Sequence, residues 1–312
     1  MTPSARAVAA LLVVASLPVL AGQTGFEVKS LDGRRTLTPP AVAAEARAKM
    51  EAQLAEAEAA LAKAPDDPDA RIWVGRRLAY LGRYRDALKV FTDGITRFPK
   101  DARFYRHRGH RYLTVRQIDR AIADFEQAAA LTKGLPDQIE PDGQPNARNI
   151  PTSSLQSNIW YHLALARYLK RDFSGAAADW TKARDVLDND DNRVAATAWL
   201  YVSLRRAGRP AEAAAALAPI HAGMNVIENQ SYLSLLLLHK GERTEADVVG
   251  AAGEGSAGSR LGDRFPGVPA KLAELVIEKW DPATLPKLDV LFASLPTGAS
   301  AEALALVPKD VK

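Results

Sequence analysis

The apolar positions of this chain recur as a helix-turn-helix pattern with a fixed period. Five alanines each open the second helix of one such pattern, namely Ala87, Ala121, Ala176, Ala213 and Ala246. The first two are about 34 residues apart, a period typical of stacked helical pairs. Their surroundings repeat with the same shift, since Gly75 and Phe91 become Gly109 and Phe125. The pattern therefore predicts an all-α chain in which each pair packs on the next.

These residues resemble the tetratricopeptide repeat (TPR) family. The resemblance implies a TPR-like right-handed α-solenoid of about five helical pairs with capping helices. The first two pairs are expected at about 68–99 and 101–133, and the fifth is weaker because Gly250 falls at a large aromatic position. Such arrays present an extended surface and enclose no pocket. The resemblance thus implies a scaffold that binds a protein or peptide, and not an enzyme.

Interruptions of the pattern divide the chain into segments. Residues 1–21 place Arg6 before an apolar run too short to span a bilayer, which predicts a signal peptide and export to the periplasm or outside the cell. An uncleaved anchor or a disordered tail is the alternative. Residues 22–40 are expected to be an extended lead-in and 41–251 the array, which starts with a capping helix at 41–63. Residues 252–312 are expected to be a linker followed by C-terminal helices.

About 21 extra residues, 134–154, separate the second and third pairs. This loop contains Pro136, Pro141, Gly143, Pro145 and Pro151, so no helix is expected in it. A loop of this length inside a compact array is usually functional or disordered. We therefore expect it either to bind a ligand or to contact the array itself.

The amino-acid composition excludes several kinds of functional site. The chain has no cysteine, which excludes disulfides and thiolate metal sites. Its formal charge of +4 becomes +3 without residues 1–21, whose one charged side chain is Arg6, and this is too small to imply nucleic-acid binding. No cofactor is predicted. Gly253 to Gly258 match the spacing G-x-G-x-x-G, but the strand-turn-helix context that presents a pyrophosphate is missing, so a linker is the interpretation.

The candidate site is a basic stretch that enters the second pair. Eight basic residues there, Arg97, Lys100, Arg103, Arg106, Arg108, Arg111, Arg116 and Arg120, outnumber Asp101 and Asp119. By the resemblance, the positions that line the concave face of related arrays are occupied by Arg76, Arg103, Arg106 and His110, with Tyr161, Tyr168, Arg205 and Arg206 further along. Guanidinium groups beside aromatic rings suit a carboxylate, a phosphate or an acidic peptide.

Two structural alternatives stand beside this interpretation. The acidic residues of the loop, Asp137, Glu140 and Asp142, could fold back and neutralise the arginines. Arg108 falls where the family has an inward leucine, so it must reach the surface or find an internal carboxylate.

Two other functions also stay open. One is an enzyme or metal-dependent protein built on His107, His110 and the loop, although no glutamate or third ligand completes the two histidines. The other is a structural protein that assembles with further copies through the weak fifth pair.

Overall fold

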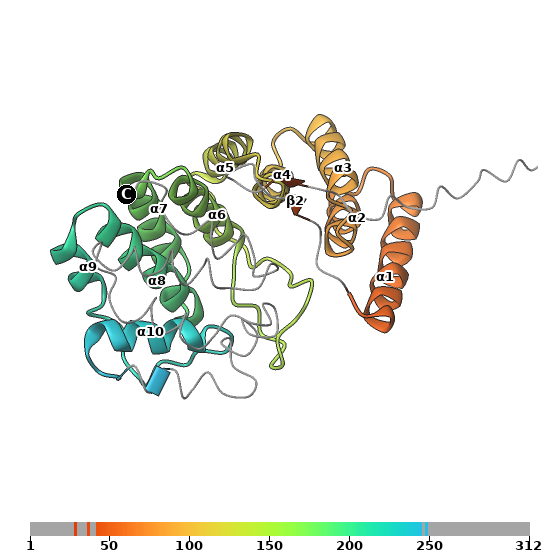
Figure 1. The fold of residues 1–312 in the computed structure, drawn as a ribbon. Helices are drawn as coiled ribbons and strands as arrows, with labels where there is room; N and C mark the ends of the chain where they lie inside the picture. The colour runs from red at the N-terminus through yellow and green to blue at the C-terminus, as the bar shows by residue number, and fades with distance from the viewer. Residues whose placement is uncertain (1–27, 30–35, 38–41, 245–246, 249–312) are drawn as a thin grey trace, which may run out of the picture.

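The computed structural model describes residues 28–29, 36–37, 42–244 and 247–248 (Figure 1). The predicted signal peptide, the linker and C-terminal helices, and Ala246 and Gly250 of the fifth pair lie outside these residues. Within the predicted lead-in, β1 (Val28–Lys29) and β2 (Thr36–Leu37) form an antiparallel pair with Val28 opposite Leu37.

Ten helices follow in the described residues, and they stack in chain order into an arch (Figure 1). They are α1 (Ala44–Lys63), α2 (Pro68–Tyr80), α3 (Tyr84–Arg97), α4 (Ala102–Thr114), α5 (Ile118–Thr132), α6 (Leu155–Leu169), α7 (Phe173–Val186), α8 (Asp190–Arg206), α9 (Pro210–Ala216) and α10 (Gln230–Lys240). The pairs are α2 with α3, α4 with α5, α6 with α7 and α8 with α9. The first helix of each pair also packs on the first helix of the next, while α1 packs on α2 and α10 on α8.

The turns inside the pairs share one backbone conformation. Each first helix is followed by a residue with positive φ: Gly82 (76°), Arg116 (63°), Arg171 (67°), Gly208 (73°) and Gly241 (81°). This left-handed conformation ends a helix and suits glycine, because other residues suffer contact between Cβ and the backbone. The turn after α10 therefore matches those of the complete pairs.

The repeat period has a direct packing cause. A Cβ atom added at Gly75 would lie 2.4 Å from the ring of Phe91, and one at Gly109 would lie 3.0 Å from the ring of Phe125. Each phenylalanine follows its glycine at the same spacing in the sequence and is fully buried. The glycine lets the two helices of a pair approach closely around the ring. In the third pair, Ala164 and Trp180 repeat this spacing, and both are fully buried.

An ion pair with the buried carboxylate of Asp124 determines the placement of Arg108. Its Nε and Nη2 atoms donate to the two carboxylate oxygens of Asp124 in α5, at 2.8 and 2.7 Å. The hydrogen bonds to Asp124 raise the pKa of Arg108 above its ordinary value. The internal carboxylate, and not the surface, is thus the partner. Asp179 of α7 plays a similar part for Arg167 of α6, at 3.1 Å.

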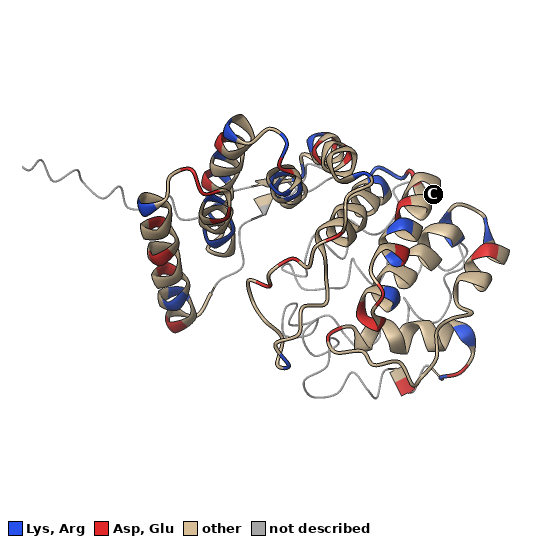
Figure 2. Ribbon diagram, turned by 180° about the vertical axis from the view of Figure 1, so that it is seen from behind, with Lys and Arg blue, Asp and Glu red and all other residues tan. Residues whose placement is uncertain are grey.

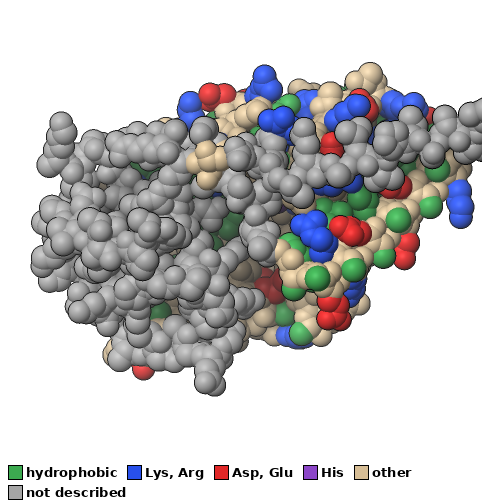
Figure 3. Space-filling view, turned by 45° about the vertical axis from the view of Figure 1, so that its right-hand side comes forward, with side chains coloured by type: hydrophobic (Ala, Val, Ile, Leu, Met, Phe, Trp, Pro, Cys, Tyr) green, Lys and Arg blue, Asp and Glu red, His purple; other side chains and the backbone are tan. Residues whose placement is uncertain are grey.

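The predicted all-α, TPR-like solenoid is confirmed. Four complete helical pairs and the first helix of a fifth fall within the described residues. No described helix is both long enough and apolar enough to cross a membrane. Basic and acidic side chains alternate along the helices and are mixed over the described part of one face (Figures 2 and 3).

Candidate functional site

The loop of residues 134–154 lies on the inner side of the arch, where α2, α4 and α6 face it (Figure 1). Its two arms meet in an isolated antiparallel bridge between Ile139 and Ser154. The Glu140 amide donates to the Ser153 carbonyl at 3.2 Å, and the Leu155 amide donates to the Gln138 carbonyl at 2.8 Å. This pairing fixes the register of the first arm and directs Glu140 toward α4.

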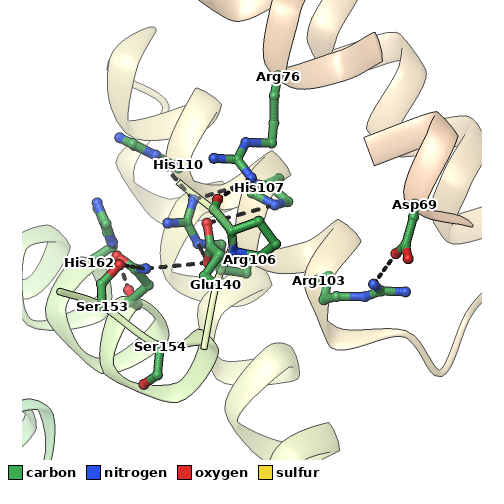
Figure 4. A network of polar contacts seen from close by, with 12 residues as sticks. Asp69, Arg76, Arg103, Arg106, His107, His110, Glu140, Ser153, Ser154 and His162 are labelled. Atoms are coloured by element: carbon green, nitrogen blue, oxygen red, sulfur yellow. Dashed lines mark hydrogen bonds and ion pairs between the residues drawn. The ribbon is translucent and has the colours of Figure 1, made fainter. Parts of the chain in front are cut away.

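Glu140 forms an ion pair with the predicted site residue Arg106. Its Oε2 lies 2.9 Å from Arg106 Nε, and the two side chains are 11% and 8% exposed. Asn158 of α6 also donates to this carboxylate at 3.3 Å. His107 Nε2 lies 4.0 Å from its other oxygen, as the close-up shows (Figure 4). The loop therefore folds back on the arginines and supplies a buried carboxylate to them.

The other two acidic residues of the loop do not reach the arginines. Asp137 accepts the backbone amides of Gln138 and Gln156, at 2.9 and 3.0 Å. Asp142 accepts the amide of Gln144 at 2.9 Å. The interpretation that all three acids neutralise the basic stretch is therefore wrong for Asp137 and Asp142, because their carboxylates accept backbone amides of the loop and of the start of α6.

Two neighbouring arginines of α2 hold the loop by its backbone. Arg76 donates to the Pro141 carbonyl at 2.8 Å, and Arg77 donates to the Gly143 carbonyl at 3.2 Å. Gly143 lies so close to α2 that an added Cβ would be 1.9 Å from the hydroxyl oxygen of Tyr80. The segment 140–143 thus passes over α2 and α4, and the carbonyls of Pro141 and Gly143 face guanidinium groups.

Three histidines lie close together beside Arg106. Arg106 Nη1 lies 3.1 Å from His107 Nδ1 and 3.4 Å from His110 Nδ1, and the rings of His110 and His162 are 4.3 Å apart. Desolvation, followed by the positive charge of nearby arginines, lowers the pKa of His107 and His110 well below the ordinary value. The same causes lower the pKa of His162 to about 3. The three rings are therefore neutral at pH 7, and the Nδ1 atoms of His107 and His110 can accept from Arg106.

Arg111 adds a further cation to this side of α4. Desolvation, followed by repulsion from Arg106, lowers the pKa of Arg111 to about 10, so it stays charged at pH 7. Its guanidinium carbon lies 5.8 Å from the centre of the Tyr84 ring. We call Arg76, Arg77, Arg106 and Arg111 the inner arginine cluster. Among the described residues, Glu140 is the one carboxylate paired with it.

The structure brings together only some of the predicted site residues. Arg76, Arg106 and His110 meet at the loop, whereas Arg103 turns toward Asp101, 2.6 Å away, and Asp69 (Figure 4). These contacts raise the pKa of Arg103 and fix its side chain between α2 and the start of α4. Arg103 therefore serves the packing of the first two pairs and is not part of the inner arginine cluster.

The remaining predicted residues form a separate aromatic group farther along the array. Tyr161 packs edge-on against Trp180 with ring centres 4.5 Å apart, and desolvation raises its pKa well above the ordinary value. Arg206 donates to the Tyr168 hydroxyl at 3.0 Å, while Arg205 is exposed. These four residues thus pack within the array or point to solvent, and they do not extend the arginine cluster.

Arg77 belongs to the cluster but was not predicted as a site residue, and its only signal is that it follows Arg76 in the sequence. Arg111 was counted in the basic stretch but was not among the positions assigned to the concave face. The far arm of the loop was also missed: Arg148 donates to Asn225 at 3.1 Å, and Thr152 donates to Glu228 at 2.5 Å. The loop therefore connects the inner arginine cluster with the segment before α10.

No group of three or more His, Asp or Glu side chains that could hold a metal ion occurs in the part of the chain that the structure describes. The fold and site define a TPR-like helical array whose inner face is occupied by its own loop.

Comparisons with known proteins give a partial match. No family model matches the chain. A stretch of 66 residues is 83% identical to one curated N-acetyl-gamma-glutamyl-phosphate reductase and 80% identical to another. The first is from Methylobacterium sp. (strain 4-46) and the second from Bradyrhizobium sp. (strain BTAi1 / ATCC BAA-1182). The matched stretch is 21% of this chain and 20% of each reductase. The chain thus spans about a fifth of the length of the curated relatives it matches.

Solved structures with a similar fold are low in sequence identity. BtubC (BKLC) from P. vanneervenii aligns with a TM-score of 0.46 and 18% identity, over 78% of this chain and 95% of that chain. TTC0263, a thermophilic TPR protein in Thermus thermophilus, aligns with a TM-score of 0.45 and 19% identity, over 62% of this chain and 93% of that chain.

Proposed function

We propose that this protein is an exported, non-enzymatic scaffold that binds a protein or peptide partner through the inner face of its helical array. One observation carries the proposal. The inner arginine cluster holds a peptide segment without regular secondary structure, the loop at 140–143, by two backbone carbonyls and one carboxylate. A surface that binds one acidic segment has the donors to bind another.

The chemistry of the cluster favours an acidic partner. Guanidinium groups make short, charge-assisted hydrogen bonds to carboxylates, and their planar fork of donors matches the two carboxylate oxygens. Neutral histidines beside Arg106 add ring nitrogens without adding a competing positive charge. Because the recognition is electrostatic, we expect salt to weaken it.

The proposal leaves out reductase activity, because the matching stretch is a fifth of that enzyme and the described residues form helical pairs. Export is proposed from the N-terminal sequence alone, in which Arg6 precedes an apolar run of signal-peptide length. Mass spectrometry of the protein purified from its own cells tests this part. A mature N-terminus near residue 22 supports export, and an intact Met1 contradicts it.

Crosslinked capture of partners from the native cell extract tests the binding face. The informative variant is Arg111→Gln, because Arg111 belongs to the cluster but makes none of the described contacts to the loop. The matched control is Lys89→Gln, which removes a charge from α3, the second helix of its pair. A partner that is lost with Arg111→Gln, kept with Lys89→Gln and weakened by salt supports the proposal. Equal capture by both variants contradicts it.

A further inference from the structure

The loop contacts the inner face as a bound peptide would, and not as part of the core. Its contacts there are polar, formed by the carbonyls of Pro141 and Gly143 and the carboxylate of Glu140. Its large apolar side chains are not used: Leu135, Ile139 and Ile150 are 59%, 54% and 44% exposed. These three are the exposed large hydrophobic residues among the described positions. Burial of apolar surface therefore contributes little to holding this segment in place.

The charges at the site are not balanced by the loop. Three guanidinium groups contact the segment, and Arg111 lies near that of Arg106, while Glu140 supplies one carboxylate among the described residues. Arg111 is the member of the inner arginine cluster with which the loop makes no described contact. A segment with a second carboxylate would meet a cation that the loop does not use, and it would therefore bind more strongly than the loop does.

The loop is also attached on both sides of the contacting segment. Before it, Gln156 of α6 donates its side-chain amide to the Leu135 carbonyl at 3.0 Å and its backbone amide to Asp137. After it, Arg148 and Thr152 bind the segment before α10. When residues 138–144 leave the arginines, the bridge between Ile139 and Ser154 opens, but the contacts of Leu135, Asp137, Arg148 and Thr152 keep both ends of the loop on the array.

We infer that residues 138–144 occupy the inner arginine cluster in place of an extended acidic segment of a partner protein, and that the partner binds by displacing them. The loop is then an internal competitor that lowers the apparent affinity for weakly acidic segments. A segment with two or more carboxylates overcomes it. This inference rests on the proposed function, because it assumes that the inner face is the binding face.

The probe for the test is a fluorescently labelled peptide with the sequence of residues 137–145, and its control carries glutamine at the position of Glu140. Binding to the full chain is measured by fluorescence anisotropy. Two variants release the loop by different means: Glu140→Gln removes the ion pair, and Gly143→Ala places a methyl group against Tyr80. Asp142→Asn is the matched control, since it removes a carboxylate that contacts just the Gln144 amide within the described part of the chain.

We expect both release variants to bind the probe at least about tenfold more tightly than the wild type. A site that is open in a tenth of the molecules shows a tenth of its intrinsic affinity. Asp142→Asn should match the wild type, and the glutamine peptide should bind weakly to every form. Circular dichroism confirms that each variant keeps its helices.

The outcomes separate the inference from the proposed function. If wild type and release variants bind the probe equally, and Arg111→Gln weakens all of them, the inner face binds acidic peptides but the loop does not compete. That result overturns the inference alone. If no form binds the probe, both the inference and the acidic specificity of the proposed function are overturned.

Discussion

Replacing Asp124 alone should destabilise the array far more than replacing Asp124 and Arg108 together. Arg108 stands where the repeat pattern expects an inward leucine, and Asp124 is its buried partner in α5. Asp124→Ala leaves a guanidinium without its carboxylate, and Arg108→Leu leaves a carboxylate without its guanidinium. The double variant Arg108→Leu, Asp124→Leu removes both charges and puts two apolar side chains in their place.

The exposure of the two side chains sets the expected changes in the free energy of unfolding. The side chains of Arg108 and Asp124 are 17% and 8% exposed, so the pair is largely desolvated. Removing one partner of a buried pair costs about 3–5 kcal/mol, whereas replacing both by apolar residues is often neutral. Arg108 keeps a hydrogen bond to the Thr92 hydroxyl at 3.2 Å, which places the cost of Asp124→Ala near the lower end, about 3 kcal/mol. The double variant should lie within about 1 kcal/mol of wild type.

Urea unfolding followed by far-ultraviolet circular dichroism measures these differences. Tryptophan fluorescence is recorded in parallel, because helical arrays can unfold in parts and the two signals then diverge. The reasoning is refuted if Asp124→Ala changes the free energy of unfolding by less than about 0.5 kcal/mol. It is refuted equally if the double variant costs the sum of the two single ones, because the charges would then be independent.

Three further predictions concern other parts of the array. The pKa values of His107, His110 and His162 are lowered in the folded state, so below about pH 6.5 the unfolded chain binds more protons than the folded one. The free energy of unfolding should therefore fall as the pH drops from 7 to 5, by up to about 1.4 kcal/mol per pH unit for each histidine. An unchanged urea midpoint at pH 5.5 would argue against neutral histidines. Asp191→Ala should lower the free energy of unfolding by about 2–3 kcal/mol, because this buried carboxylate accepts three backbone amides before α10. Thermal unfolding, compared with that of Asp190→Ala, measures the loss. Gly82→Ala should cost about 1–2 kcal/mol through its φ of 76°, and no loss of stability would refute the turn conformation.

The helical array could be predicted because its causes are local and repeated. Gly75 and Phe91 have the same spacing in sequence as Gly109 and Phe125, and this spacing also links Ala164 to Trp180. A small residue facing a large one at constant spacing leaves a pattern that the sequence displays directly. The internal partner of Arg108 could be anticipated as one of two outcomes, but nothing in the sequence identified Asp124.

The site could be predicted only in part, because its contacts depend on the path of a long loop. Asp137, Glu140 and Asp142 lie close together in sequence and are alike in charge, yet only Glu140 reaches the arginines. The choice follows from the bridge between Ile139 and Ser154, which is a pairing of distant backbone positions. Arg103 shows the converse: its position on the helix suggested the inner face, but the nearby carboxylate of Asp101 draws it away.

Hydrogen exchange of the wild-type protein, with and without a saturating peptide of residues 137–145, tests most directly whether the loop occupies the partner's place. The amides of 138–144, including that of Glu140, which donates to the Ser153 carbonyl, report on the loop. We predict that the bound peptide makes these amides exchange faster while those of α4 stay protected. Unchanged or slower exchange of the loop, with the peptide bound, would contradict displacement and place the binding surface elsewhere on the array.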